Sequence, residues 1–243
     1  MENSWNGFER IDTAYLGKDV ILVKPKKALE GNPWVWRAEF FGAFATADLM
    51  LLERGWHVAY YRQNNMYGCP EAVEGMKSFY DYAVNTLGLS PFPSLFGFSR
   101  GGLYTVNYAL KYPSTLSSVY LDAPVTDIRS WPAKSKEHQK EWQDCMRLYG
   151  LTEQTAVGFK NNPNDNAEAF AKLNIPFILV AGLSDELVPY DENGEIFLSR
   201  YEAAGGKAEV ILKENCGHHP HSLEDATPIA DFVEEAFRKH ARV

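Results

Sequence analysis

Ser99 is the residue whose surroundings point most directly to chemistry. It lies in the segment Leu-Phe-Gly-Phe-Ser-Arg-Gly-Gly, between Gly97 and Gly101, at the spacing Gly-x-Ser-x-Gly. This spacing is typical of a sharp turn from a strand into a helix, where a side chain at either glycine would clash with nearby backbone. Residues 93–98 are apolar like a buried strand, and residues 101–112 carry apolar side chains at helical spacing. The motif predicts that Ser99 is a nucleophile raised above the edge of a sheet.

A serine hydroxyl is a weak nucleophile at neutral pH, so it needs a histidine to take its proton and a carboxylate to orient that histidine. Asp185 follows the apolar run 176–181, and His218 follows the run 208–213. Both runs are expected strands, and the carboxyl ends of parallel strands meet at the reactive edge of an open sheet. The order Ser99, Asp185, His218 along the chain therefore predicts a Ser-His-Asp triad.

The acid has a competitor in Asp122, because the strand expected at residues 117–122 would also place a carboxylate at the sheet edge. The segment Asp-x-x-Val-Pro that begins at Asp185 favours the later residue. We expect Asp122 and Asp127 to brace the loop that follows their strand. Glu186, next to Asp185, is a solvent-facing alternative.

Three histidines, His218, His219 and His221, fall within four positions of one loop. His218 is favoured as the base because it directly follows Gly217, and His221 takes its place if that assignment is wrong. A zinc site is the competing interpretation. However, ligands at successive positions of one loop point in different directions, and a serine triad needs no metal. We therefore predict no metal and no cofactor.

Together these segments resemble the α/β-hydrolase fold family, and the resemblance covers nearly the whole chain. Residues 97–101 are similar to the family's nucleophile elbow, residues 182–189 to its acid loop, and Gly217-His218 to its histidine loop. The resemblance implies an α/β fold with a mostly parallel eight-stranded sheet flanked by helices. It also implies a serine hydrolase that works through an acyl-enzyme.

The resemblance further implies an oxyanion hole made of backbone N–H groups. The N–H of Arg100, the residue after the nucleophile, would be the first donor. The family often has His-Gly after its third strand, whereas this chain reads Arg37-Ala38-Glu39 at that point. Ala38 and Glu39 are therefore the candidates for the second donor. The side chain of Arg100 would pair with Glu39 or Asp122, or reach toward the substrate.

The elements that must position these groups alternate between strands and helices, which implies right-handed crossovers and a parallel sheet. The apolar patterns predict strands at residues 10–16, 19–23, 33–37, 57–61, 93–98, 117–122, 176–181 and 208–213, and helices at 43–54, 70–87, 101–112 and 228–241.

About fifty residues separate the sixth and seventh of these strands, many more than such connections usually contain. We expect residues 125–172 to form two or three short helices that act as a lid over the reactive edge. The side chains expected to contact substrate combine aromatic rings with one imidazole: Trp36, Tyr67, Trp131, Trp142 and His221.

Length and composition fit one domain over residues 1–243, because 45% of the residues are hydrophobic and no linker or repeat interrupts the chain. A net charge of −8 argues against nucleic acid or an anionic membrane as partner. The apolar runs are too short to span a bilayer, and no secretory signal is visible. The three cysteines are scattered, like reduced thiols. We expect a cytoplasmic protein, or a secreted one if a signal peptide has been removed.

These observations lead us to expect a hydrolase whose partner is a small-molecule ester, with an acylated sugar or related plant-derived compound as one candidate. A peptidase or amidase of the same fold is the first alternative, because such enzymes share the triad. A ligand-binding protein built on the hydrolase scaffold is the second. The sequence does not define the acyl group, the alcohol or the oligomeric state.

Overall fold

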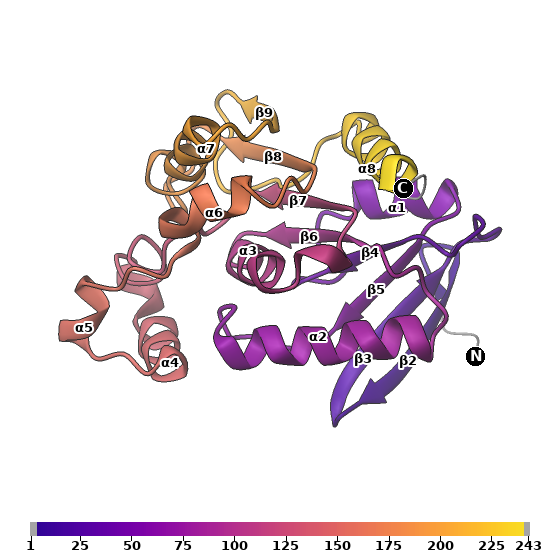
Figure 1. Ribbon diagram of the computed structural model, residues 1–243, viewed down its shortest axis with the longest axis horizontal. Helices are drawn as coiled ribbons and strands as arrows, with labels where there is room; N and C mark the ends of the chain where they lie inside the picture. Colours follow the sequence, from indigo (N-terminus) through magenta and orange to yellow (C-terminus); the bar gives the residue numbers. More distant parts are fainter. Residues whose placement is uncertain (1–3, 241–243) are drawn as a thin grey trace.

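A single twisted sheet forms the centre of the computed structural model, which describes residues 4–240. Within these residues the sheet has nine strands in the order β1-β2-β3-β5-β4-β6-β7-β8-β9 (Figure 1). The strands are β1 (Ser4–Trp5), β2 (Phe8–Tyr15), β3 (Lys18–Lys24), β4 (Trp34–Arg37), β5 (His57–Tyr61), β6 (Ser94–Phe98), β7 (Ser118–Asp122), β8 (Phe177–Gly182) and β9 (Glu209–Lys213).

The pairs β1-β2, β2-β3 and β3-β5 are antiparallel, and every further pair along the sheet, from β5-β4 to β8-β9, is parallel. The predicted α/β class with a mostly parallel sheet is therefore confirmed. The expected number of eight strands is one too few, because the two-residue strand β1 is too short to leave a pattern in the sequence.

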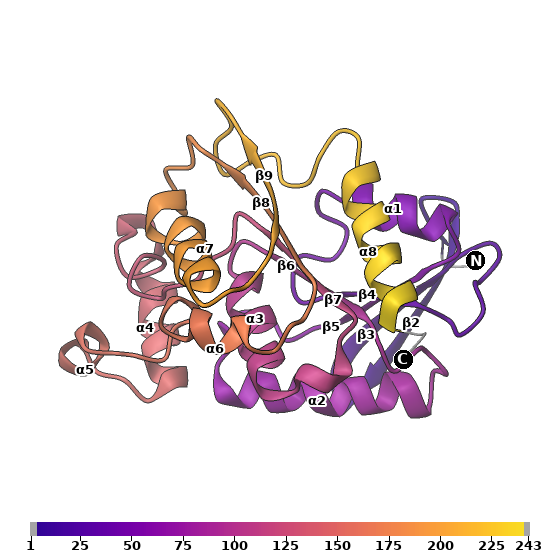
Figure 2. The same ribbon diagram turned by 45° about the horizontal axis from the view of Figure 1, so that its top comes forward.

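Helices cover both faces of the sheet and bury two apolar clusters. On one face, α2 (Pro70–Asn85), α3 (Gly101–Lys111), α6 (Ala167–Ala171) and α7 (Gly194–Ala203) pack over one cluster. On the other face, α1 (Thr46–Glu53) and α8 (Thr227–His240) lie side by side over the second (Figure 2). The predicted end of the last helix at residue 241 lies outside the described residues.

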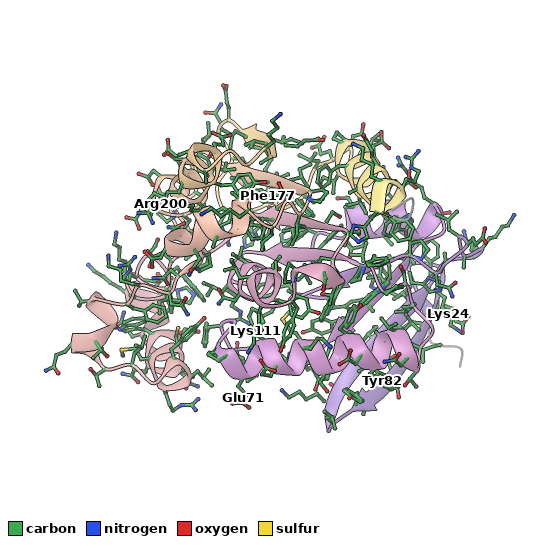
Figure 3. The ribbon with its side chains drawn as sticks, in the orientation of Figure 1. Lys24, Glu71, Tyr82, Lys111, Phe177 and Arg200 are labelled. Carbon is green, nitrogen blue, oxygen red and sulfur yellow. The ribbon has the colours of Figure 1, made fainter. Side chains whose placement is uncertain are left out.

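The face of the sheet covered by α2, α3, α6 and α7 carries large aromatic rings. Phe177 of β8 lies between the sheet and helices α6 and α7 (Figure 3), and its ring packs edge-on against Phe170, Phe197 and Tyr201. Burial of such rings stabilises the sheet that carries the reactive loops, since each ring removes a large apolar area from water. The strand ends are thereby held on a rigid base.

The long connection between β7 and β8 contains α4 (Gln139–Tyr149), α5 (Glu153–Val157) and α6, and α4 and α5 project from the body (Figure 1). Three helices agree with the predicted two or three. The insertion has an apolar cluster of its own, in which Trp131, Trp142 and Cys145 pack against Leu103 of α3. None of the helices between residues 4 and 240 combines the length and apolar character that crossing a membrane requires.

Candidate active site

The turn between β6 and α3 holds Ser99 in a conformation that side chains seldom adopt, with φ at 49°. The backbone N–H of Ser99 donates to the carbonyl of Asp122 at 2.9 Å, which fixes the turn to the end of β7. A Cβ on Gly97 would lie 2.5 Å from Thr105 Oγ1 and 2.8 Å from the carbonyl of Gly101. The turn therefore needs glycine at position 97, as the motif predicts.

The second glycine of the motif behaves differently from the prediction. A Cβ on Gly101 would meet its nearest neighbour at 3.9 Å, which is an ordinary contact. The close approach occurs one residue later, where a Cβ on Gly102 would lie 2.6 Å from Pro124 Cβ and 2.8 Å from the carbonyl of Val125. The predicted clash at Gly101 is therefore wrong, because helix α3 meets the loop after β7 at Gly102.

The structure brings Ser99, His218 and Asp185 together from three different loops. His218 Nε2 lies 2.9 Å from Ser99 Oγ, and His218 Nδ1 lies 2.7 Å from Asp185 Oδ2. The other oxygen of Asp185 accepts the N–H groups of Leu187 at 2.9 Å and Val188 at 2.8 Å. Because an ionised carboxylate can only accept, it favours the tautomer with hydrogen on Nδ1. The lone pair on Nε2 then faces the serine hydroxyl, as proton transfer requires.

A second carboxylate and imidazole pair lies beside the first and was not foreseen. Asp122 Oδ1 is 2.7 Å from His221 Nδ1, and Asp122 Oδ2 accepts the N–H of Ser222 at 2.7 Å as well as the hydroxyl of Tyr120. Asp122 therefore braces the histidine loop, instead of the loop that follows its own strand. The predicted brace at Asp127 does lie in that following loop, where its carboxylate accepts the N–H of Arg129 at 2.8 Å.

The two candidates for the second oxyanion donor differ in their hydrogen bonds. The N–H of Ala38 donates to the carbonyl of Phe96 at 3.0 Å and so continues the pairing of β4 with β6. This bond uses the donor, so the prediction for Ala38 is wrong. The backbone nitrogen of Glu39 lies 4.0 Å from the position that a Cβ on Gly101 would take. Glu39 thus lies beside the first turn of α3, next to Arg100.

An ion pair between Arg100 and Glu39 joins the two loops. The side chain of Glu39 is 1% exposed and that of Arg100 is 16% exposed. The Glu39 carboxylate also accepts the Tyr104 hydroxyl and the N–H of Asn65, both at 3.2 Å. Burial raises the pKa of Glu39, and the charge and hydrogen bond of Arg100 oppose that rise. Of the partners expected for Arg100, the structure therefore selects Glu39 over Asp122.

Arg100→Ala is expected to destabilise the fold, because it leaves the Glu39 carboxylate buried without a cationic partner. We expect the free energy of unfolding to fall by about 3 kcal/mol near neutral pH. Without Arg100, the strongest influence that opposes the effect of burial is lost, so the pKa of Glu39 should be higher in the variant than in the wild type. The loss of stability should therefore shrink as the pH falls, because Glu39 becomes protonated and a neutral carboxyl group needs no cationic partner. Urea unfolding at about pH 5 and about pH 8 measures this. The control is Arg100→Ala with Glu39→Gln, and equal losses at both pH values would contradict the argument.

A cavity of about 390 Å³ opens beside Ser99. Its walls are mostly aromatic and imidazole rings, with one carboxylate and one guanidinium. The residues that line it are Phe40, Ala43, Phe44, Phe98, Ser99, Arg100, Trp131, His138, Glu141, Leu187, His218, His219 and His221.

Of the residues predicted to contact substrate, Trp131 and His221 line this cavity. Trp36 does not, because it is 1% exposed and stacks on Trp34 within the core. Trp142 is buried inside the insertion, where its indole N–H donates to Glu153 at 3.3 Å. Tyr67 is 1% exposed and packs behind Trp131. The predictions that Trp36, Trp142 and Tyr67 contact substrate are therefore wrong, because these rings are buried in apolar clusters.

The predicted site residues Ser99, Arg100 and His218 also line the cavity, whereas Phe44, His138 and Glu141 were not predicted from the sequence. His138 and Glu141 belong to the insertion, and the unusual length of that insertion was the one sequence feature that pointed to this region. Phe44 stacks on His219 with ring centroids 5.1 Å apart, a contact between segments far apart in the chain. No local pattern in the sequence reports such a contact.

The histidine loop is also the place where a metal ion could be held. Ring nitrogens of His218, His219 and His221 lie within 4.8 Å of one another. However, His218 and His221 each direct Nδ1 at a carboxylate, and His218 Nε2 already faces Ser99 Oγ. A metal on His218 Nε2 would remove the base from the serine. The arrangement therefore fits proton transfer better than metal binding.

Comparisons with known proteins agree with this geometry at the level of family. The model of the prolyl oligopeptidase family matches residues 53–240, a range that contains Ser99, Asp185 and His218. A comparison with curated protein sequences finds no match.

Solved structures with a similar fold include peptidases and an α/β hydrolase of similar length. Dipeptidyl peptidase 4 of Porphyromonas gingivalis has a TM-score of 0.67 at 14% identity, covering 94% of this chain and 35% of that chain. A puromycin-hydrolyzing peptidase of Mycobacterium tuberculosis has a TM-score of 0.69 at 16% identity, covering 93% and 39%. An α/β hydrolase from the sediment metagenome of the Mar Chica lagoon, Morocco, has a TM-score of 0.62 at 15% identity, covering 95% and 99%. The chain thus spans little more than a third of each peptidase, and the shared fold is that of the α/β hydrolases.

Proposed function

Because the chain belongs to the prolyl oligopeptidase family, we propose that it is a serine hydrolase, and that it cleaves a small carboxylic ester through an acyl-enzyme. The observation that carries this proposal is the hydrogen-bonded series from Ser99 Oγ through His218 to Asp185, with distances of 2.9 and 2.7 Å, at the wall of the cavity. Each of these groups has the partner that nucleophilic catalysis by serine requires.

In the proposed reaction Ser99 Oγ attacks the ester carbonyl while His218 Nε2 takes its proton. Asp185 holds the ring and stabilises the imidazolium that forms. The backbone N–H groups of Arg100 and Glu39 stabilise the oxyanion. The imidazolium then gives its proton to the leaving alcohol, and the acyl group remains on Ser99. Water activated by His218 attacks the acyl-enzyme, releasing the carboxylic acid and restoring the serine hydroxyl.

The cavity supports a compact substrate. A volume of about 390 Å³ lies near the lower end of the range for small-molecule sites. Trp131, His138 and Glu141 reach this cavity from the insertion, which supports the proposal that residues 125–172 act as a lid within a single domain. Aromatic walls beside one carboxylate and one guanidinium suit a substrate with both apolar and polar parts.

A peptidase or amidase is the second candidate, because the family is named for a peptidase and two of the similar structures are peptidases. The two functions use the same acylation machinery and differ in the leaving group. An amine is the poorer leaving group and must be protonated as it departs, so the amide reaction depends more strongly on proton donation by His218.

A pair of chromogenic substrates with one acyl group tests the proposal. We expect 4-nitrophenyl butyrate to give a burst of product followed by a slower steady rate, and 4-nitroanilide of butyric acid to be cleaved at least about 100-fold more slowly. Stopped-flow absorbance measures both. An enzymatic ratio of ester to anilide kcat/KM far below the ratio of their uncatalysed hydrolysis rates would instead favour the amidase. Extending the ester series to palmitate should lower kcat/KM, and a steady rise with chain length would exclude the compact site.

A further inference from the structure

His221 and Asp122 form a buried pair that the proposed mechanism does not use. His221 is 6% exposed and Asp122 is 0% exposed, with His221 Nδ1 2.7 Å from Asp122 Oδ1. A carboxylate in this position accepts the hydrogen on Nδ1, so the neutral ring carries its lone pair on Nε2. His221 thus has a defined tautomer with a hydrogen-bond acceptor at its outer nitrogen.

The orientation of this acceptor is fixed from several sides. The second oxygen of Asp122 accepts the N–H of Ser222 at 2.7 Å and the Tyr120 hydroxyl, so the carboxylate is held by both its own strand and the histidine loop. The His221 ring packs between Phe44 and Phe98, at centroid distances of 5.1 and 5.4 Å. Burying a carboxylate costs free energy, and an apolar side chain could fill this space without that cost. The Asp122 carboxylate therefore indicates that the orientation of the His221 ring matters.

The His221 side chain reaches the wall of the cavity beside Ser99. Over residues 4–240, the structure records no hydrogen bond at His221 Nε2. This nitrogen is also absent from the set of fully buried polar atoms without a partner, so it keeps some surface that a small molecule can reach. It is therefore open to a small molecule in the cavity. Phe44 and Phe98 beside His221 offer no competing hydrogen bond. The rings of His218 and His219 pack edge to face against His221 at centroid distances of 4.8 and 4.9 Å, and over the described residues neither ring has a recorded hydrogen bond to His221. Nε2 can therefore accept from a donor on the substrate.

The acceptor also lies close to the reacting atoms. The ring centroids of His221 and His218 are 4.8 Å apart, and the two rings meet edge to face. His218 Nε2 in turn lies 2.9 Å from Ser99 Oγ. A donor bound at His221 Nε2 would therefore belong to an atom only a few bonds away from the scissile carbonyl.

From these observations we propose that His221 is a specificity residue that binds a hydroxyl group on the alcohol side of the substrate, adjacent to the ester oxygen. The corresponding substrate class is the monoester of a vicinal diol, as in a partly acylated polyol or sugar. This inference rests on the proposed function, and it adds a subsite to the same cavity.

Two esters of equal size test the inference: 2-hydroxyethyl butyrate, which carries the hydroxyl, and propyl butyrate, which has a methyl group in its place. We expect wild-type kcat/KM to be about 10-fold higher for the hydroxy ester, as one hydrogen bond provides. His221→Asn keeps an N–H that can reach Asp122 and removes the acceptor at Nε2. In this variant the ratio should fall to about one. A displaced histidine loop would lower both rates together and leave the ratio unchanged, so the ratio separates binding from positioning.

The control is His219→Asn, which alters the neighbouring cavity histidine and should keep the wild-type ratio. A wild-type ratio near one, or a ratio that survives in His221→Asn, would overturn the inference while leaving the hydrolase proposal intact. The same comparison is made with N-(2-hydroxyethyl)butanamide and N-propylbutanamide. Cleavage of the amides alone would contradict the ester proposal, and their ratio would still decide the role of His221. If 4-nitrophenyl butyrate is cleaved but neither pair is, the inference about His221 is wrong and the hydrolase proposal stands. If 4-nitrophenyl butyrate is not cleaved either, the hydrolase proposal fails.

Discussion

Ser99→Ala is expected to lower kcat for ester hydrolysis on the order of 10⁶-fold, the loss seen when a serine nucleophile is removed. The reason is that, among residues 4–240, Ser99 is the only nucleophile hydrogen-bonded to His218 Nε2, at 2.9 Å. The fold should tolerate the change, because alanine keeps the Ser99 backbone N–H that donates to Asp122. Initial rates with 4-nitrophenyl butyrate and thermal unfolding measure the two effects.

Covalent labelling gives this expectation an independent control. A fluorophosphonate should modify Ser99 alone, and peptide mapping by mass spectrometry identifies the site. Ser184→Ala is the matched variant, because Ser184 is an exposed serine next to Asp185, and it should keep both labelling and activity. A label on another serine, or wild-type turnover in Ser99→Ala, would show that the nucleophile is elsewhere.

The placement of Ser99, Asp185 and His218 could be predicted because each lies in a short segment that the fold requires locally. Gly97 is necessary where the turn at Ser99 approaches Thr105. Asp185 lies in the loop after the buried strand β8, and His218 lies in the loop after β9, whose residues are exposed or half-buried. Parallel strands then bring their carboxyl ends to one edge of the sheet, independently of the sequence of the other segments. Short-range patterns and one topological rule are sufficient for this part of the site.

The pair formed by His221 and Asp122 could not be predicted in the same way. Its members are 99 residues apart, and their contact depends on how the loop after β9 turns back toward β7. The error at Ala38 has a similar origin, since the pairing of β4 with β6 continues one residue beyond the strand and uses that N–H. Both features are decided by tertiary hydrogen bonds that leave no periodic pattern.

The error at Trp36 has a different physical cause. Strand β4 lies between β5 and β6 in the middle of the sheet, so both of its faces are covered and all four of its residues are buried. A tryptophan there must pack in the core, although its strand ends near the reactive edge. Aromatic composition therefore overestimates the number of rings available to a substrate. Most of the rings that line the cavity come from segments beyond the strand ends, and Phe98 is the last residue of β6.

Asp185→Asn is expected to lower kcat/KM by about 10⁴-fold, the loss typical of a triad acid replaced by its amide. Asparagine can present an N–H to His218 Nδ1, which would favour the tautomer with hydrogen on Nε2 and so block the base from accepting the Ser99 proton. The other Asp185 oxygen, which accepts the N–H groups of Leu187 and Val188, has its counterpart in the amide oxygen. The loop should therefore keep its shape while the chemistry is lost.

Asp122→Asn is the matched comparison, because Asp122 also ends a strand and also binds a histidine through Nδ1, yet that histidine is His221 and does not contact Ser99 Oγ. We expect a loss of about 10-fold, since the variant can disturb the histidine loop only through its backbone and through His221. Rates with 4-nitrophenyl butyrate at about pH 8, together with thermal unfolding, compare the two variants. A larger loss in Asp122→Asn than in Asp185→Asn, at equal stability, would assign the acid to the end of β7. His218 would then have to exchange its partner during the reaction, which its 2.7 Å contact with Asp185 argues against.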